Sequence, residues 1–106
     1  MGVLHYGVHE VRFEDQLLSH LQVLISTKLR RGENFMMSWV RPPEQGGGRQ
    51  SLWIDNGVPI LFEYTGGRLP KISREWIDNL VVQSAGSAGI HITSQDPPAG
   101  VIIPAP

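Results

Sequence analysis

The sequence predicts an α+β domain, in which a mostly antiparallel sheet of five or six strands carries one long and one short helix on one face. Two observations support this prediction. Short stretches rich in β-branched and aromatic residues are separated by glycine, proline and asparagine, as is typical of strands and turns. Between positions 15 and 31, apolar residues recur at the period of one helical face. These residues are Leu17, Leu18, Leu21, Leu24, Ile25 and Leu29.

The first half of the chain predicts a hairpin, the long helix and a largely buried strand. Residues 1–13 alternate in polarity on both sides of a turn that begins at Gly7. Asp15 is the expected N-cap of the helix, and Gly32 stands where a left-handed residue commonly closes a helix. Residues 35–40 alternate large apolar and mixed side chains, which predicts a strand buried on one face and partly on the other.

The second half predicts a second hairpin, a shorter helix and a last strand. An Asn-Gly pair within residues 51–64 is a strong hairpin signal, although Pro59 favours an edge position or a looser loop. Ser73 is the expected N-cap of a helix that ends near Ser84. Residues 90–93 then form the final strand.

The predicted domain covers residues 1–95 and is followed by a proline-rich tail, residues 96–106. Prolines oppose both helix and central strand in this tail. It nevertheless carries the apolar triplet Val101, Ile102 and Ile103. Such a triplet favours a contact with the domain itself or with a neighbouring subunit by strand addition, and we therefore count it among the candidate interface residues.

Composition excludes several classes of protein. The chain of 106 residues is long enough for one hydrophobic core, and without cysteine it has no disulfide, thiol nucleophile or cysteine metal site. Its formal net charge of −1 provides no global field for nucleic acid. No apolar run approaches the roughly 20 residues of a membrane span, and the first residues lack a signal-peptide pattern. We expect a cytoplasmic protein with no cofactor and no membrane partner.

No catalytic or metal motif stands out. His5 and His9 are four residues apart, but in a strand and turn they need not share a face, and no H-E-x-x-H motif occurs. Ser87 follows a glycine directly, which puts it one residue out of the nucleophile-elbow pattern. We expect no catalytic residue and no metal site, with an enzyme of unknown type as the third hypothesis.

A basic cluster closes the long helix. Cations at a helix C-terminus offset the macrodipole, which by itself explains Lys28, Arg30 and Arg31. The alternative is a patch that contacts phosphate. Its candidate nucleic-acid-binding residues are Lys28, Arg30, Arg31, Arg49 and Arg68.

Aromatic and polar residues indicate where other molecules dock. The spacing of Trp39 and Trp76 among aliphatic residues predicts core positions, whereas Trp53 is a candidate exposed anchor of an interface. The helix back is polar but nearly uncharged, so it is either exposed or covered by a second partner. The residues of this back are Gln16, Ser19, Gln22, Ser26 and Thr27.

Three segments, residues 13–39, 51–64 and 74–80, together resemble an uncharacterised family of small actinobacterial proteins. The resemblance covers residues 1–95, and members of the family are often labelled ATP-dependent DNA ligase by automated annotation. It implies at most an accessory role in DNA joining. A ligase needs a lysine nucleophile in a K-x-D-G setting, and neither Lys28 nor Lys71 stands in one.

The sequence thus predicts a non-catalytic interaction or assembly module that associates with itself or with another protein. Its candidate interface residues are Trp53, Val101, Ile102 and Ile103. The alternative is a nucleic-acid-associated accessory protein that uses the local basic patch.

Overall fold

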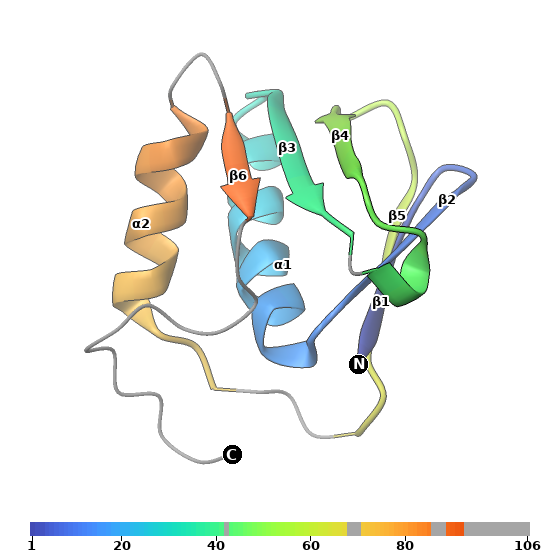
Figure 1. Cartoon of the computed structure of the whole chain (residues 1–106). Coiled ribbons are helices and arrows are strands. Elements are labelled where there is room, and N and C mark those ends of the chain that lie inside the picture. The colour runs from blue at the N-terminus through green and yellow to red at the C-terminus, as the bar shows by residue number, and fades with distance from the viewer. Residues whose placement is uncertain (42, 68–70, 86–88, 93–106) are drawn as a thin grey trace.

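The computed structural model describes residues 1–41, 43–67, 71–85 and 89–92. Within these ranges the chain forms six strands and two α-helices (Figure 1), which confirms the predicted α+β class. In chain order the elements are β1 Gly2–Tyr6, β2 His9–Phe13, α1 Asp15–Arg30, β3 Phe35–Val40, the 3-10 helix η1 Pro43–Gln45, β4 Arg49–Ile54, β5 Ile60–Glu63, α2 Arg74–Ser84 and β6 Ile90–Ile92.

The strands are divided between two three-stranded sheets instead of forming a single one. Sheet A has the order β2-β1-β5 and is antiparallel throughout. Sheet B has the order β4-β3-β6, with β3 antiparallel to β4 and parallel to β6. Three of the four strand pairs are therefore antiparallel, as predicted. The parallel pair requires a long connection, and α2 lies within it.

The predicted hairpin at residues 1–13 is confirmed, whereas the predicted hairpin at residues 51–64 is wrong. β1 and β2 pair from Gly2–Phe13 to Tyr6–His9, which leaves a two-residue turn. β4 and β5 do not pair, because the chain between them crosses from sheet B to sheet A. The tight Asn-Gly hairpin turn needs positive φ at both central residues, and neither Asn56 nor Gly57 adopts it.

Helix α1 begins one residue from the predicted position and ends as predicted. Glu14 is the N-cap, so Asp15 is the first helical residue instead of the cap. At the other end Gly32 has a φ of 71°, and its N–H donates to the carbonyl oxygen of Leu29. The N–H of Glu33 donates to the carbonyl oxygen of Lys28, which completes a Schellman closure.

Helix α1 lies in the middle of the molecule. In Figure 1 it passes behind sheet B, while α2 lies beside β6. Helix α1 contacts α2 and β1, and α2 contacts β3 and β6. The six apolar residues predicted for the core stripe are buried except Leu29, which is partly buried against the core. The predicted stripe of α2 is buried at Trp76, Ile77 and Leu80, and Val81 lies at its exposed margin.

Candidate interaction surfaces

Much of the outer face of sheet B, on the side opposite α1, is exposed to solvent, although Ser38 near its centre is buried. Strand register fixes its members, because residues paired across neighbouring strands lie on the same side of a sheet. In Figure 1 this face is turned toward the viewer. We call it the tryptophan face; it consists of Met36, Ser38, Val40, Arg49, Ser51, Trp53 and His91.

Trp53 dominates this face. Its side chain is 51% exposed, Val40 near the opposite end of β3 is 58% exposed, and Met36 beside Trp53 is half-buried. The other two tryptophans, Trp39 and Trp76, are buried, as predicted. Trp53 thus presents a large apolar ring to solvent on a regular strand, which is the geometry of a docking residue.

The same tryptophan borders a shallow depression of about 510 Å³, near the start of β3 and the end of α2. Its wall includes Lys28 and Glu33, whose Nζ and Oε1 atoms form an ion pair at 3.2 Å. Ser84 lies across the depression, and its hydroxyl donates to the carbonyl oxygen of Val81. Lys28, Glu33 and Ser84 thus have partners within the chain, and Trp53 contributes an exposed apolar ring to the lining of the depression.

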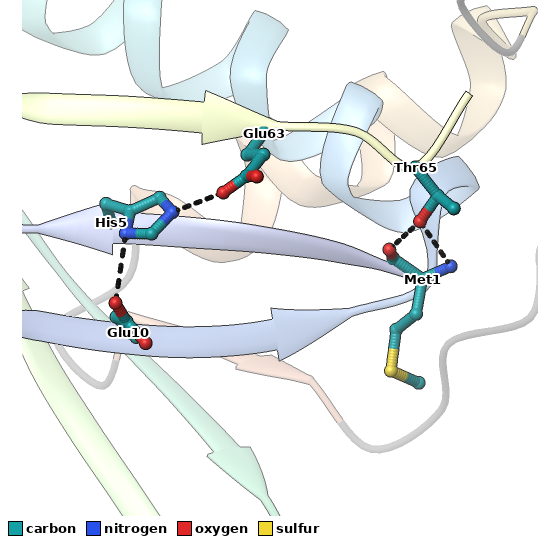
Figure 2. A network of polar contacts seen from close by, with 5 residues as sticks. All are labelled: Met1, His5, Glu10, Glu63 and Thr65. Carbon is teal, nitrogen blue, oxygen red and sulfur yellow. Dashed lines mark hydrogen bonds and ion pairs between the residues drawn. The ribbon is translucent and has the colours of Figure 1, made fainter. Parts of the chain in front are cut away.

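Sheet A also has an exposed outer face. Its centre is His5, which stands on β1 between a glutamate of β2 and a glutamate of β5 (Figure 2). The Nε2 atom of His5 is 2.7 Å from Oε1 of Glu63, and its Nδ1 atom is 3.6 Å from Oε1 of Glu10. We call this surface the acidic face; it consists of Val3, His5, Glu10, Arg12, Leu61 and Glu63.

The His5 cluster is not arranged as a metal site. Its two carboxylates contact opposite nitrogens of one imidazole ring, so the three groups do not converge on a common point. Among the described residues, no group of three or more potential ligands is placed to hold a metal ion. The cluster instead links the three strands of sheet A through side chains.

The two faces carry opposite formal charges. The acidic face has two glutamates against Arg12, whereas the tryptophan face has Arg49 and no carboxylate. On the tryptophan face, Nη2 of Arg49 contacts Nδ1 of His91, and the hydroxyls of Ser38 and Ser51 lie 2.7 Å apart. Both faces also carry exposed apolar side chains. These are Trp53 and Val40 on the tryptophan face and Leu61, which is 59% exposed, on the acidic face.

The four candidate nucleic-acid residues that the structure describes are not gathered into one patch. Lys28 is only 8% exposed, because it continues the buried stripe of α1 one turn after Leu24. Its ammonium group is paired with the carboxylate of Glu33. Arg30 and Arg31 are exposed at the end of α1, just before β3 begins. Arg49 pairs with Val40 at the far end of β3, five strand residues or about 16 Å from Phe35.

Several candidate residues lie outside the described part of the chain. Arg68 and the triplet Val101, Ile102 and Ile103 fall there, as does Ser87. The roles predicted for Arg68 and for the triplet stay predictions.

The polar back of α1 is partly covered by the chain itself. The amide of Gln16 donates to the carbonyl oxygen of Lys71, and Oε1 of Gln22 accepts a hydrogen bond from Tyr64. Burial raises the pKa of the Tyr64 phenol to about 12, with the charge of Asp15 as a second cause. Ser19 is buried. A second molecule is therefore not needed to explain why this helix back carries so little charge.

Sequence reasoning had not assigned Met36, Val40 and His91 to the candidate surface. Alternation along residues 35–40 was a usable signal, because it placed Met36 and Val40 opposite the buried side chains. His91 joins the surface only through the parallel pairing of β6 with β3, and no local pattern predicts that pairing.

These features define a small α+β domain with two exposed sheet faces of opposite charge. In comparisons with known proteins, the chain belongs to the family described as "Domain of unknown function (DUF7882)", with residues 1–95 matched. This match confirms the resemblance to an uncharacterised family over the same residues. No curated protein and no solved structure matches the chain. Neither of the two described helices is both long and apolar enough to cross a membrane.

Proposed function

We propose that this chain is a non-catalytic interaction module that self-associates, with Trp53 as a principal contact. The observation that carries the proposal is a half-exposed tryptophan on a solvent-facing sheet, next to Met36 and on the same face as Val40. Large apolar rings of this kind are enriched at the energetic centres of protein interfaces. The tail triplet remains part of the proposal as a second contact.

Sedimentation velocity of the wild-type chain across micromolar to millimolar concentrations tests this proposal. We expect the mean sedimentation coefficient to rise with concentration, and Trp53→Ala to weaken association at least about tenfold, as loss of a hot-spot side chain does. Val82→Ala is the matched control, since Val82 is 73% exposed on α2, away from both faces. A strict monomer over the whole range, with and without residues 96–106, would contradict self-association.

The second candidate function is a nucleic-acid-associated accessory protein. It is favoured by the exposed guanidinium groups of Arg30, Arg31 and Arg49, although they lie at two ends of sheet B. Fluorescence anisotropy with a labelled oligonucleotide at low salt tests it, with affinity expected to fall steeply as salt rises. Absence of binding at low salt would eliminate it. The ligase label of the resembling actinobacterial proteins is a prediction that belongs to this candidate. The cytoplasmic location is a prediction for the protein under either proposed function.

A further inference from the structure

We infer that copies of this chain associate head to tail, the tryptophan face of one copy docking on the acidic face of the next. This inference rests on the proposed self-association and adds which surfaces meet. Its basis is the opposite charge of the two exposed sheet faces and the apolar side chains that accompany each charge.

The charges of the two faces favour docking between unlike faces over docking between like faces. If two tryptophan faces met, the Arg49 guanidinium groups of both copies would share an interface without any carboxylate to pair them. If two acidic faces met, four glutamates would face two arginines. Docking unlike faces brings Arg49 of one copy toward the glutamates of the next, which is the arrangement of lowest repulsion.

Apolar contacts support the same pairing. Trp53 and Val40 are the exposed apolar side chains of the tryptophan face, and Leu61 is the exposed apolar side chain of the acidic face, on its edge strand β5. Leu61 and His5 are paired across strands, so an aromatic ring placed over Leu61 also lies near the imidazole. Glu10 and Glu63 stand on either side of His5, one on each neighbouring strand, as Figure 2 shows.

The geometry makes the association weak and repeating. Three strands about 4.8 Å apart and three to six residues long give each face only about 200–300 Å², well below a standard stable interface. Because the two faces belong to different sheets, each copy keeps one face free after docking. Heterologous contacts of this kind produce either a ring or an open chain of copies.

Charge reversal in trans tests the inference. Arg49→Glu and Glu63→Arg are each expected to lower the association constant about three- to tenfold at low salt. An equimolar mixture of the two variants is expected to recover association, because the altered faces complement each other across copies. The double variant Arg49→Glu/Glu63→Arg, whose faces have exchanged charge, is expected to recover it as well. The readout is the weight-average sedimentation coefficient.

Matched controls separate this effect from net charge and from misfolding. Arg74→Glu and Glu75→Arg make the same charge changes at exposed neighbours on α2, outside both faces, and are expected to associate like the wild type. Circular dichroism of each variant shows whether it is folded. If the wild type associates but the mixture does no better than its components, the head-to-tail inference is overturned while self-association stands. If the wild type never associates, both fall.

Discussion

Gly89 is the described glycine at which an added side chain has the least room. Its φ is 75°, and a Cβ built there would overlap the carbonyl oxygen of Met36 on the neighbouring strand. Gly32 has nearly the same φ, 71°, but a Cβ there would meet nothing within 4 Å. Substituting each of these two glycines therefore distinguishes the loss of stability caused by a positive φ from the loss caused by the close approach between β3 and the start of β6.

Gly89→Ala is expected to lower the free energy of unfolding by about 2–4 kcal/mol, because backbone strain is added to a backbone clash. Gly32→Ala is expected to cost about 1 kcal/mol, from the positive φ alone. Urea denaturation of both variants measures the two values. Equal losses would show that β6 can move aside at no cost.

The sequence distinguishes these two glycines only in part. Gly32 was predicted as a cap because it follows an apolar helical stripe, and all the information needed is local. Gly89 lay in a stretch of small residues with no feature that separates it from Gly86. Its importance arises from β3, which is some fifty residues earlier in the chain, and a local pattern does not encode that contact.

At the scale of elements, one buried imidazole links the two helices. His20 on α1 is fully buried, and its Nε2 atom accepts a hydrogen bond of 2.8 Å from the backbone N–H of Ser73. Its Nδ1 atom must then carry the proton that is donated to the carbonyl oxygen of Gln16, at 2.6 Å. Ser73 in turn caps α2 by accepting a hydrogen bond from the N–H of Trp76, whose ring packs on the imidazole.

This linkage predicts that the stability of the protein falls in mildly acidic solution. Burial lowers the pKa of His20 below its ordinary 6.5, and the hydrogen bond to Gln16 opposes this shift as the lesser cause. The unfolded chain therefore binds a proton at this residue at a higher pH than the folded chain does. Stability is fully present above pH 6.5 and is lost as the pH falls toward the folded pKa.

Denaturant unfolding at a series of pH values measures the effect. His20→Gln removes the titration while keeping an acceptor for Ser73, so its stability is expected to depend less on pH over this window. The other three histidines are common to both proteins and cancel in the comparison. The same slope in the variant and the wild type would show that His20 is not responsible.

Both helices were predictable from sequence because their signals are short-range. Ser73 and Gly32 marked two of their ends, and the apolar period marked their buried sides. The linkage between them was not predictable, since a lone histidine in an apolar stripe has no sequence feature that names its partner. The exposure of Trp53 was expected from the sequence, but the residues that share its face could be identified only from the strand register.

At the scale of the whole molecule, the main departure from the sequence prediction is the division into two sheets. An Asn-Gly pair ordinarily folds a strand back on its neighbour, which would have joined β4 and β5. Here the preceding residues pair with β3 and the following residues pair with β1, so the segment between them crosses from one sheet to the other. The strand pairing was therefore determined by partners far apart in the sequence, and the local preference of Asn-Gly for a hairpin turn did not determine it.

Tyr6 fixes this crossing. It lies on β1 of sheet A with 5% exposure, and its hydroxyl oxygen accepts a hydrogen bond of 2.7 Å from the N–H of Asp55. The same hydroxyl donates to the carbonyl oxygen of Trp53 at 3.0 Å. One phenol group thus satisfies the backbone on both sides of the last residue of β4, and it holds the strand that presents Trp53.

Tyr6→Phe is therefore expected to lower the free energy of unfolding by about 1–3 kcal/mol, because it leaves a backbone N–H and a carbonyl without their partner. Tyr64→Phe is the control: its hydroxyl donates to Gln22, an exposed side chain that can turn to water, so the loss is expected to stay below about 1 kcal/mol. Hydrogen exchange at the Asp55 amide is expected to accelerate in the first variant alone. If that amide stays protected without the Tyr6 hydroxyl, the crossing is held by the pairing of β4 with β3, and the two sheets keep their arrangement without help from β1.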